Sequence, residues 1–139
     1  MASIFTRIIN GEIPGRFVWR DEQAVAFLDV RPLAPGHCLV VPVLEIDRWT
    51  DLPASVATHL MAVSHAVANA QQLVFGPPRV GLMIAGFEVP HVHVHVFPTA
   101  GMAAFDFAQA DTSPDPTDLD TYAVALKTAL RAAGHRAVA

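Results

Sequence analysis

The chain has 139 residues, a formal net charge of −4 and a hydrophobic fraction of 53%. A chain of this length buries roughly two thirds of its unfolded surface without a disulfide or metal staple, so we expect one domain over residues 1–139. The eight Arg and one Lys form no basic stripe, which argues against a nucleic-acid polymer as a partner. No apolar run approaches the roughly 18 residues that a membrane helix needs. With one cysteine and no signal-peptide pattern, we expect a cytoplasmic protein.

The first 43 residues predict a short helix followed by three strands. Ser3 is a candidate N-cap for a helix over residues 4–10, and Gly11 is its stop signal. The strands are rich in β-branched or aromatic residues and are bounded by turn residues; they cover residues 17–20, 24–30 and 37–43. An acidic turn joins the first two strands into a β-hairpin, which favours antiparallel pairing.

The rest of the chain predicts two helices and two strands. Apolar residues three or four positions apart indicate a long helix over residues 54–75. The two strands cover residues 80–89 and 91–98. Residues 101–118, rich in Pro, Asp and Ala, predict an irregular loop, and a last helix follows over residues 119–134.

This order of elements predicts an α+β fold. We expect a mainly antiparallel five-stranded sheet covered by a short N-terminal helix, a long central helix and a C-terminal helix. The edges of so small a sheet invite pairing with a second copy, so a homodimer is also expected.

The segment "PHVHVHVFPT" holds three histidines at every second position: His91, His93 and His95. In a strand these imidazoles share one face, while the intervening valines share the other face and can enter the core.

Three interpretations of this row of imidazoles are open. It can be an ordinary half-exposed strand, a three-histidine metal site, or a set of groups for nucleophilic and acid/base chemistry. The metal interpretation lacks both an HExxH helix and a partner cysteine. His59 and His65 lie six residues apart on the predicted long helix and therefore on different faces, so we interpret both as non-catalytic.

The segment "HVHVHVF" fits the H-φ-H-φ-H-φ-φ signature, with φ apolar, and therefore resembles the histidine triad (HIT) superfamily. Upstream, "IFTRIINGEIPGRFVWRDEQAVAFLDVRPLAPGHCLVVP" is similar to the N-terminal half of that family, in particular to its Hint-like branch of nucleotidyl hydrolases and transferases. The likeness covers about residues 3–99 and implies a HIT-like fold.

The resemblance also implies roles for four histidines. His93 matches the family's nucleophile, which attacks the α-phosphate of a nucleotide and forms a nucleotidyl-histidine intermediate. His95 matches the histidine that contacts the phosphate and helps the leaving group, and His91 matches one that supports the nucleophile's surroundings. His37 matches a fourth histidine at the edge of the site.

A nucleotide-binding set follows from the same resemblance. Asp29 matches a carboxylate that hydrogen-bonds the ribose hydroxyls, and backbone N–H groups around Gly86 suit the phosphate oxygens. Phe87 and Glu88 stand where the family commonly has polar groups that assist at the phosphate. The residues that match an apolar pocket for the base are Ile4, Phe5, Ile8, Phe27, Leu28 and Val30.

The implied function is a nucleotide-binding hydrolase or transferase that acts on a nucleoside phosphoramidate or on a nucleotidyl ester or anhydride. Its partner is a purine nucleotide or an AMP-like conjugate, and we expect no cofactor. Ser3 and Thr6 stand where many bacterial relatives have Cys-x-x-Cys for zinc, so no structural metal is expected. Two alternatives stay open: a non-catalytic purine-nucleotide-binding module, in which Phe87 and Glu88 have removed turnover, and a histidine-ligated metalloenzyme.

Overall fold

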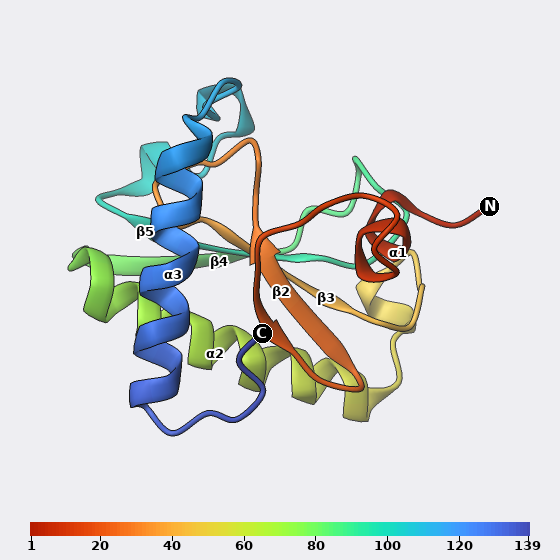
Figure 1. Cartoon of the computed structure of the whole chain (residues 1–139). Coiled ribbons are helices and arrows are strands. Elements are labelled where there is room, and N and C mark those ends of the chain that lie inside the picture. Colours follow the sequence, from red (N-terminus) through yellow and green to blue (C-terminus); the bar gives the residue numbers. More distant parts are fainter.

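Five antiparallel strands form one sheet in the computed structural model, which describes residues 1–139 (Figure 1). The helices and strands are α1 Ile4–Ile9, β1 Phe17–Arg20, β2 Ala24–Leu28, β3 Cys38–Pro42, α2 Ala54–Phe75, β4 Arg79–Met83, β5 Val94–Thr99 and α3 Pro116–Ala132. Three short 3-10 helices complete the fold: η1 Trp49–Asp51, η2 Met102–Ala104 and η3 Phe107–Gln109. The strand order is β1-β2-β3-β5-β4. The predicted α+β class and its five-stranded antiparallel sheet are confirmed.

Local chemistry sets the ends of the helices. At α1 the Thr6 amide donates to Ser3 Oγ at 3.0 Å, as an N-cap serine predicts. Asp115 caps α3 through its carboxylate, and Pro116 takes the first helical turn. Helix α2 ends at Gly76, whose φ of 60° is left-handed.

The two faces of the sheet have different partners. Val92, Val94 and Val96 enter the larger hydrophobic core, which α2 and α3 complete. The opposite face carries a smaller cluster with α1: Phe5, Ile8, Val25, Phe27, Leu39 and Val41. In Figure 1, α2 runs below the sheet, and α1 lies at the right, far from α3. The predicted inward orientation of the valines is therefore confirmed.

The face opposite α2 is also covered by the segment after β5. Phe105 packs edge-on against Phe97, with ring centroids 4.9 Å apart, and Phe107 packs against His95 at 4.9 Å. The side chain of His95 therefore lies between α1 on one side and the η2–η3 segment on the other.

Four predicted strands are shorter than the sequence indicated, and β4 and β5 differ most. Strand β5 begins at Val94 and not at His91, because the preceding amides bond outside the ladder. The His91 amide donates to Val89 and the Val92 amide donates to Ile46, each at 2.8 Å. Strand β4 ends at Met83 and not at residue 89, so residues 84–93 form a connecting segment.

Other boundaries differ by a few residues. The predicted loop over residues 101–118 contains η2 and η3, and α3 begins at Pro116 because Asp115 and not a later residue provides its cap. The C-terminal helix therefore covers 116–132 in place of 119–134. Strand β2 ends at Leu28, since Asp29 turns away to bind the amide of Arg31.

One edge of the sheet is covered by the C-terminal residues and the other is not. The C-terminal residues cover β1: the Arg20 amide donates to Ala137 at 2.8 Å, and Val138 forms an isolated bridge with Trp19. Strand β4 forms the other edge and pairs only with β5. None of the helices combines the length and the apolarity that crossing a membrane requires.

Candidate active site

The three histidines of the triad lie on a turn and on the strand that follows it. His95 pairs with Leu39 of β3 and Met83 of β4, so it lies on an inner strand of the sheet. His91 and His93 lie just before β5. All three side chains are buried, and the exposed fractions of these residues are only 0 to 3%. Buried imidazoles need hydrogen-bond partners, and those partners define which ring nitrogen carries the proton.

The ring of His93 is held in one tautomer by its own backbone. Its Nδ1 lies 2.8 Å from the carbonyl oxygen of His91. A carbonyl oxygen only accepts, so Nδ1 carries the hydrogen and Nε2 keeps its lone pair. Phe5 and His95 pack edge-on against the ring, at 4.8 and 5.0 Å between centroids. The lone pair of the neutral ring is therefore on Nε2.

A second chain of hydrogen bonds orients His95. The amide of Leu33 donates to His37 Nδ1 at 2.9 Å, so a neutral His37 carries its hydrogen on Nε2. That Nε2 lies 3.0 Å from His95 Nδ1, which therefore accepts. The remaining nitrogen of His95, Nε2, carries a hydrogen and has no partner in the protein. His95 thus offers an unpartnered N–H donor in a buried position.

Burial keeps His37 and His95 neutral at pH 7. It lowers the pKa of His37 to about 3, with His95 adding to the effect, and it lowers the pKa of His95 to about 4, with His93 adding to it. Burial also lowers the pKa of His91, against the effect of its bond to the Pro42 carbonyl.

Asp29 lies beside this histidine pair. Its Oδ2 is 3.6 Å from His37 Nε2 and 4.0 Å from His95 Nδ1. Burial raises the pKa of Asp29, the bond from the Arg31 amide opposes that rise, and the Glu88 carboxylate adds to it. The Asp29 carboxylate therefore lies next to the two ring nitrogens that join His37 to His95.

Asp29, His37 and His95 are close enough to be considered as metal ligands, since their ligand atoms lie within 4.8 Å of one another. A metal ion needs a lone pair on each ligating nitrogen. In His37 the Leu33 amide already occupies the lone pair of Nδ1, and Nε2 carries the hydrogen. Asp29, His37 and His95, with these hydrogen bonds, therefore do not fit a metal ion.

His91 is tied to the start of α1. Its Nε2 lies 2.8 Å from the Pro42 carbonyl and must donate, so Nδ1 accepts from Ser3 Oγ at 2.6 Å. Glu45 completes the network: its Oε1 accepts from the Ser3 amide at 2.7 Å and from Thr6 Oγ1 at 2.6 Å. These bonds lower the pKa of Glu45 to about 2.

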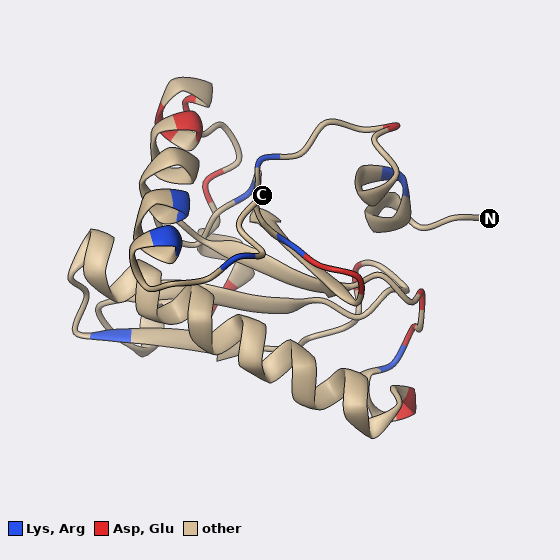
Figure 2. Cartoon of the chain, turned by 60° about the horizontal axis from the view of Figure 1, so that its bottom comes forward, with Lys and Arg blue, Asp and Glu red and all other residues tan.

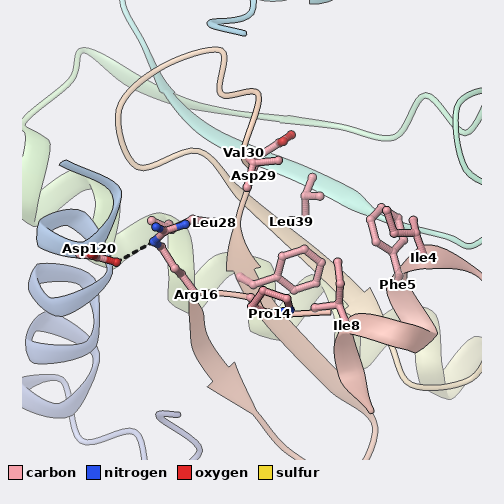
Figure 3. Close-up of a pocket in the computed structure, with 12 residues that line it drawn as sticks. Ile4, Phe5, Ile8, Pro14, Arg16, Leu28, Asp29, Val30, Leu39 and Asp120 are labelled. Carbon is pink, nitrogen blue, oxygen red and sulfur yellow. Dashed lines mark hydrogen bonds and ion pairs between the residues drawn. The ribbon is translucent and has the colours of Figure 1, made fainter. Parts of the chain in front are cut away.

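A cavity of about 500 Å³ opens between α1 and the end of β2 (Figure 3). This volume suits a small-molecule ligand. All seven residues predicted for the base and ribose line it: Ile4, Phe5, Ile8, Phe27, Leu28, Asp29 and Val30. Arg16 and Asp120 close one side through an ion pair of 2.7 Å, so α3 contributes to the wall. Sequence reasoning missed these two because their contact spans 104 positions.

The turn before the triad has a different arrangement. Gly86 has a φ of +81°, which glycine adopts readily. Phe87 is 97% exposed. Glu88 lines a second, smaller cavity of about 60 Å³, together with Asp29, Arg31, His95, Phe107 and Ala110. Phe107 and Ala110 belong to the segment predicted as an irregular loop, and no local pattern in the sequence marks them.

Comparisons with known proteins agree with this geometry. The family model described as "HIT domain" matches residues 10–102. An uncharacterized HIT-like protein of Methanocaldococcus jannaschii is 38% identical over 68% of this chain and 77% of its own length. The adenosine 5′-monophosphoramidase of Saccharomyces cerevisiae is 35% identical over 70% of this chain, and the adenylylsulfatase of Arabidopsis thaliana is 29% identical over 68% of it. The matched regions span 62% and 51% of those two proteins.

Solved structures share the whole fold. A zinc-bound histidine triad family protein from Mycobacterium smegmatis superposes with a TM-score of 0.81 at 26% identity, covering 96% of both chains. A Hit-like protein from Bartonella henselae gives 0.79 at 26% identity, covering 91% of this chain and 95% of its own.

Proposed function

The chain belongs to the HIT, or histidine triad, family and to its Hint-like branch, and from that premise we propose that it hydrolyses or transfers a nucleotidyl group at the α-phosphate of a purine nucleotide derivative. The observation that carries this proposal is the 2.8 Å contact between His93 Nδ1 and the His91 carbonyl oxygen. It leaves Nε2 of a buried imidazole free to attack. The name of the yeast relative, a monophosphoramidase, supports a nucleoside phosphoramidate as the substrate class.

Substrate binding follows from the larger cavity. The apolar side chains of α1 and β2 suit a purine ring, and burying that ring stabilises the complex by the hydrophobic effect. Asp29, at the end of β2, is the acceptor for the ribose hydroxyls. The ribose contact sets the α-phosphate near the histidines, because Asp29 lies within 4.0 Å of His95.

The proposed chemistry has two balanced steps. His93 Nε2 attacks phosphorus, the bond from phosphorus to the amine nitrogen breaks, and the departing nitrogen takes up one proton from solvent by way of His95. Phosphoimidazolium forms on His93, which keeps its Nδ1 hydrogen on the His91 carbonyl. Water then attacks phosphorus, releases the nucleoside monophosphate and returns one proton to solvent. His37 acts as a positioning residue, since it holds the tautomer of His95.

The test is hydrolysis of adenosine 5′-phosphoramidate, followed as release of AMP. We expect the wild-type protein to turn over and the His93→Ala variant to lose about three orders of magnitude or more in kcat. His65→Ala is the matched control, because this exposed histidine on α2 reaches only Asn69 at 3.5 Å. Equal rates in wild-type and His93→Ala proteins would refute His93 as the nucleophile.

A non-catalytic nucleotide-binding module is the second candidate, and the position of Phe87 favours it. This side chain, 97% exposed, offers no hydrogen-bond donor where the family commonly has one. Calorimetry with AMP separates the two candidates: binding by the wild-type protein, with no turnover of phosphoramidate, ester or anhydride substrates, would favour the binding module.

We also infer a homodimer formed through β4 and α2. Strand β4 is the uncovered edge of the sheet, and α2 carries no charged residue along its length (Figure 2). Three large apolar side chains beside them are exposed: Trp49, Met61 and Leu82. They border a groove in which Ser64 Oγ is buried without a partner. A second copy of the chain pairs with the free edge of β4 and covers the exposed apolar side chains.

The cytoplasm remains the proposed location. Cys38 is free and buried, and a free thiol fits a reducing compartment.

A further inference from the structure

We propose that the cavity of about 60 Å³ beside His95 is the leaving-group subsite, and that Glu88 and Phe107 restrict it to compact amines and exclude anionic leaving groups such as sulfate. This inference rests on the proposed nucleotidyl-transfer function and specifies its substrate class.

The position of this cavity suits a leaving group. It shares Asp29 with the larger cavity, so the two are neighbours on either side of that carboxylate. Three successive ring contacts cross the site, from Phe5 to His93, from His93 to His95 and from His95 to Phe107, at 4.8, 5.0 and 4.9 Å. The nucleophile is therefore on the α1 side of His95, and the small cavity is on the other. In an in-line displacement the leaving group departs on the side opposite the nucleophile.

His95 supplies the group that a departing amine needs. Its Nε2 is buried, has no partner in the protein and belongs to a residue that lines the small cavity. A buried hydrogen-bond donor without a partner costs free energy. A ligand atom that accepts a hydrogen bond from His95 Nε2 removes that cost and stabilises the complex. The nitrogen that leaves phosphorus is such an acceptor.

The walls of the cavity limit the size of the leaving group. The cavity's volume of about 60 Å³ is small beside the volume of about 500 Å³ of the larger cavity. Phe107 is held on His95, and the segment around it is anchored at both ends. Phe105 packs on Phe97, and the Asp111 amide donates to the Pro32 carbonyl at 2.9 Å. The folded structure of residues 105–111 therefore holds Phe107 in place as a wall of the small cavity.

The charges around the cavity favour an amine over an anion. Two acidic residues, Asp29 and Glu88, line it with one basic residue, Arg31. Sulfate leaves as a dianion and gains negative charge next to Glu88, whereas an amine leaves neutral or as a cation. The carboxylate of Glu88 therefore raises the barrier for sulfate and not for an amine. This chain should follow the monophosphoramidase relative and not the adenylylsulfatase relative in its choice of leaving group.

The test compares kcat/KM for adenosine 5′-phosphoramidate and adenosine 5′-phosphosulfate. We expect the wild-type protein to prefer the phosphoramidate. Glu88→Gln keeps the shape and removes the charge, so it should shift the ratio toward the phosphosulfate by about tenfold. Glu22→Gln removes an equivalent exposed charge in the turn between β1 and β2 and should leave the ratio unchanged.

A second variant tests the size restriction. Phe107→Ala should raise kcat/KM for an N-benzyl phosphoramidate relative to the unsubstituted one by about tenfold, because it opens the wall of the small cavity. Phosphoramidate hydrolysis by the wild-type protein, with both ratios unchanged within twofold in the variants, would overturn this inference alone. A wild-type protein that hydrolyses neither compound would overturn the proposed function and this inference with it.

Discussion

Acidification from pH 7 to pH 5 should weaken the fold through the two neutral, buried histidines, His37 and His95. Their folded pKa values, about 3 and about 4, lie below the ordinary value of 6.5. Between those values the unfolded chain binds a proton at each position and the native state does not, so stability falls as pH falls. From pH 7 to pH 5 the free energy of unfolding falls by about 2 kcal/mol for each histidine and by about 4 kcal/mol for the two together. This is a large share of the 5–15 kcal/mol typical of a domain.

Urea unfolding at pH 7 and pH 5 measures this loss directly. The His37→Asn variant should lose only about 2 kcal/mol over the same interval, since one titrating group is gone. Asp29 acts in the opposite sense, because its raised pKa makes the native state bind a proton before the unfolded state does. The Asp29→Asn variant should therefore lose more stability than the wild-type protein as the pH falls toward 3.8, the ordinary pKa of an aspartate.

Ring titration by NMR provides an independent measurement that does not depend on unfolding. We expect the His37 and His95 rings to stay neutral down to pH 5. A midpoint near 6.5 for either ring, or a difference in the free energy of unfolding below about 1 kcal/mol between the two pH values, would refute the reasoning.

Three further changes test the fold and the assembly. Ser3→Ala removes the N-cap bond to Thr6 and the bond to His91, so urea unfolding should show a loss of about 2 kcal/mol, and a loss below about 0.5 kcal/mol would contradict the network. Gly36→Ala combines a φ of +85° with a contact between the new Cβ and the Phe75 ring, so it should destabilise by more than about 2 kcal/mol, whereas Gly11→Ala, with a similar φ and open space, should lose only about 1 kcal/mol; equal losses would show that the ring does not matter. Leu82→Arg places a charge on the exposed side of β4, and light scattering should show a monomer where the wild-type protein is a dimer; a monomeric wild-type protein would exclude the proposed interface.

Periodic segments of the chain were predictable, and their ends depended on local chemistry. Helix α2 covers the residues expected from its apolar spacing, 54–75, because that spacing is long and is ended by a left-handed glycine. Helix α3 starts three residues earlier than predicted. Its N-cap, Asp115, lies in a segment where several Asp, Ser and Thr residues are equally good caps by sequence alone.

The site was predictable only where the family motif reaches. All the residues expected around the base line one cavity, although from the sequence alone plain core is the likelier explanation for any one of them. Glu45 and Phe107 were not predicted, because each joins the site through a contact between distant segments. Glu45 meets Ser3 across 42 positions, and Phe107 meets His95 from a segment with no periodicity. Such contacts depend on the tertiary fold, which local patterns do not encode.

The three histidines of the triad do not all lie on one strand, although their spacing of two residues predicts that they do. His91 and His93 precede the strand, so the period of two does not place all three rings in one ladder. Backbone groups determine which ring nitrogen of each histidine carries the hydrogen. These groups are the His91 carbonyl for His93, the Pro42 carbonyl for His91 and, through His37, the Leu33 amide for His95. The reactive tautomers are thus a property of the backbone path. It follows that substitutions that shift the turn before β5, or the turn that carries Leu33, will change reactivity while every histidine is retained.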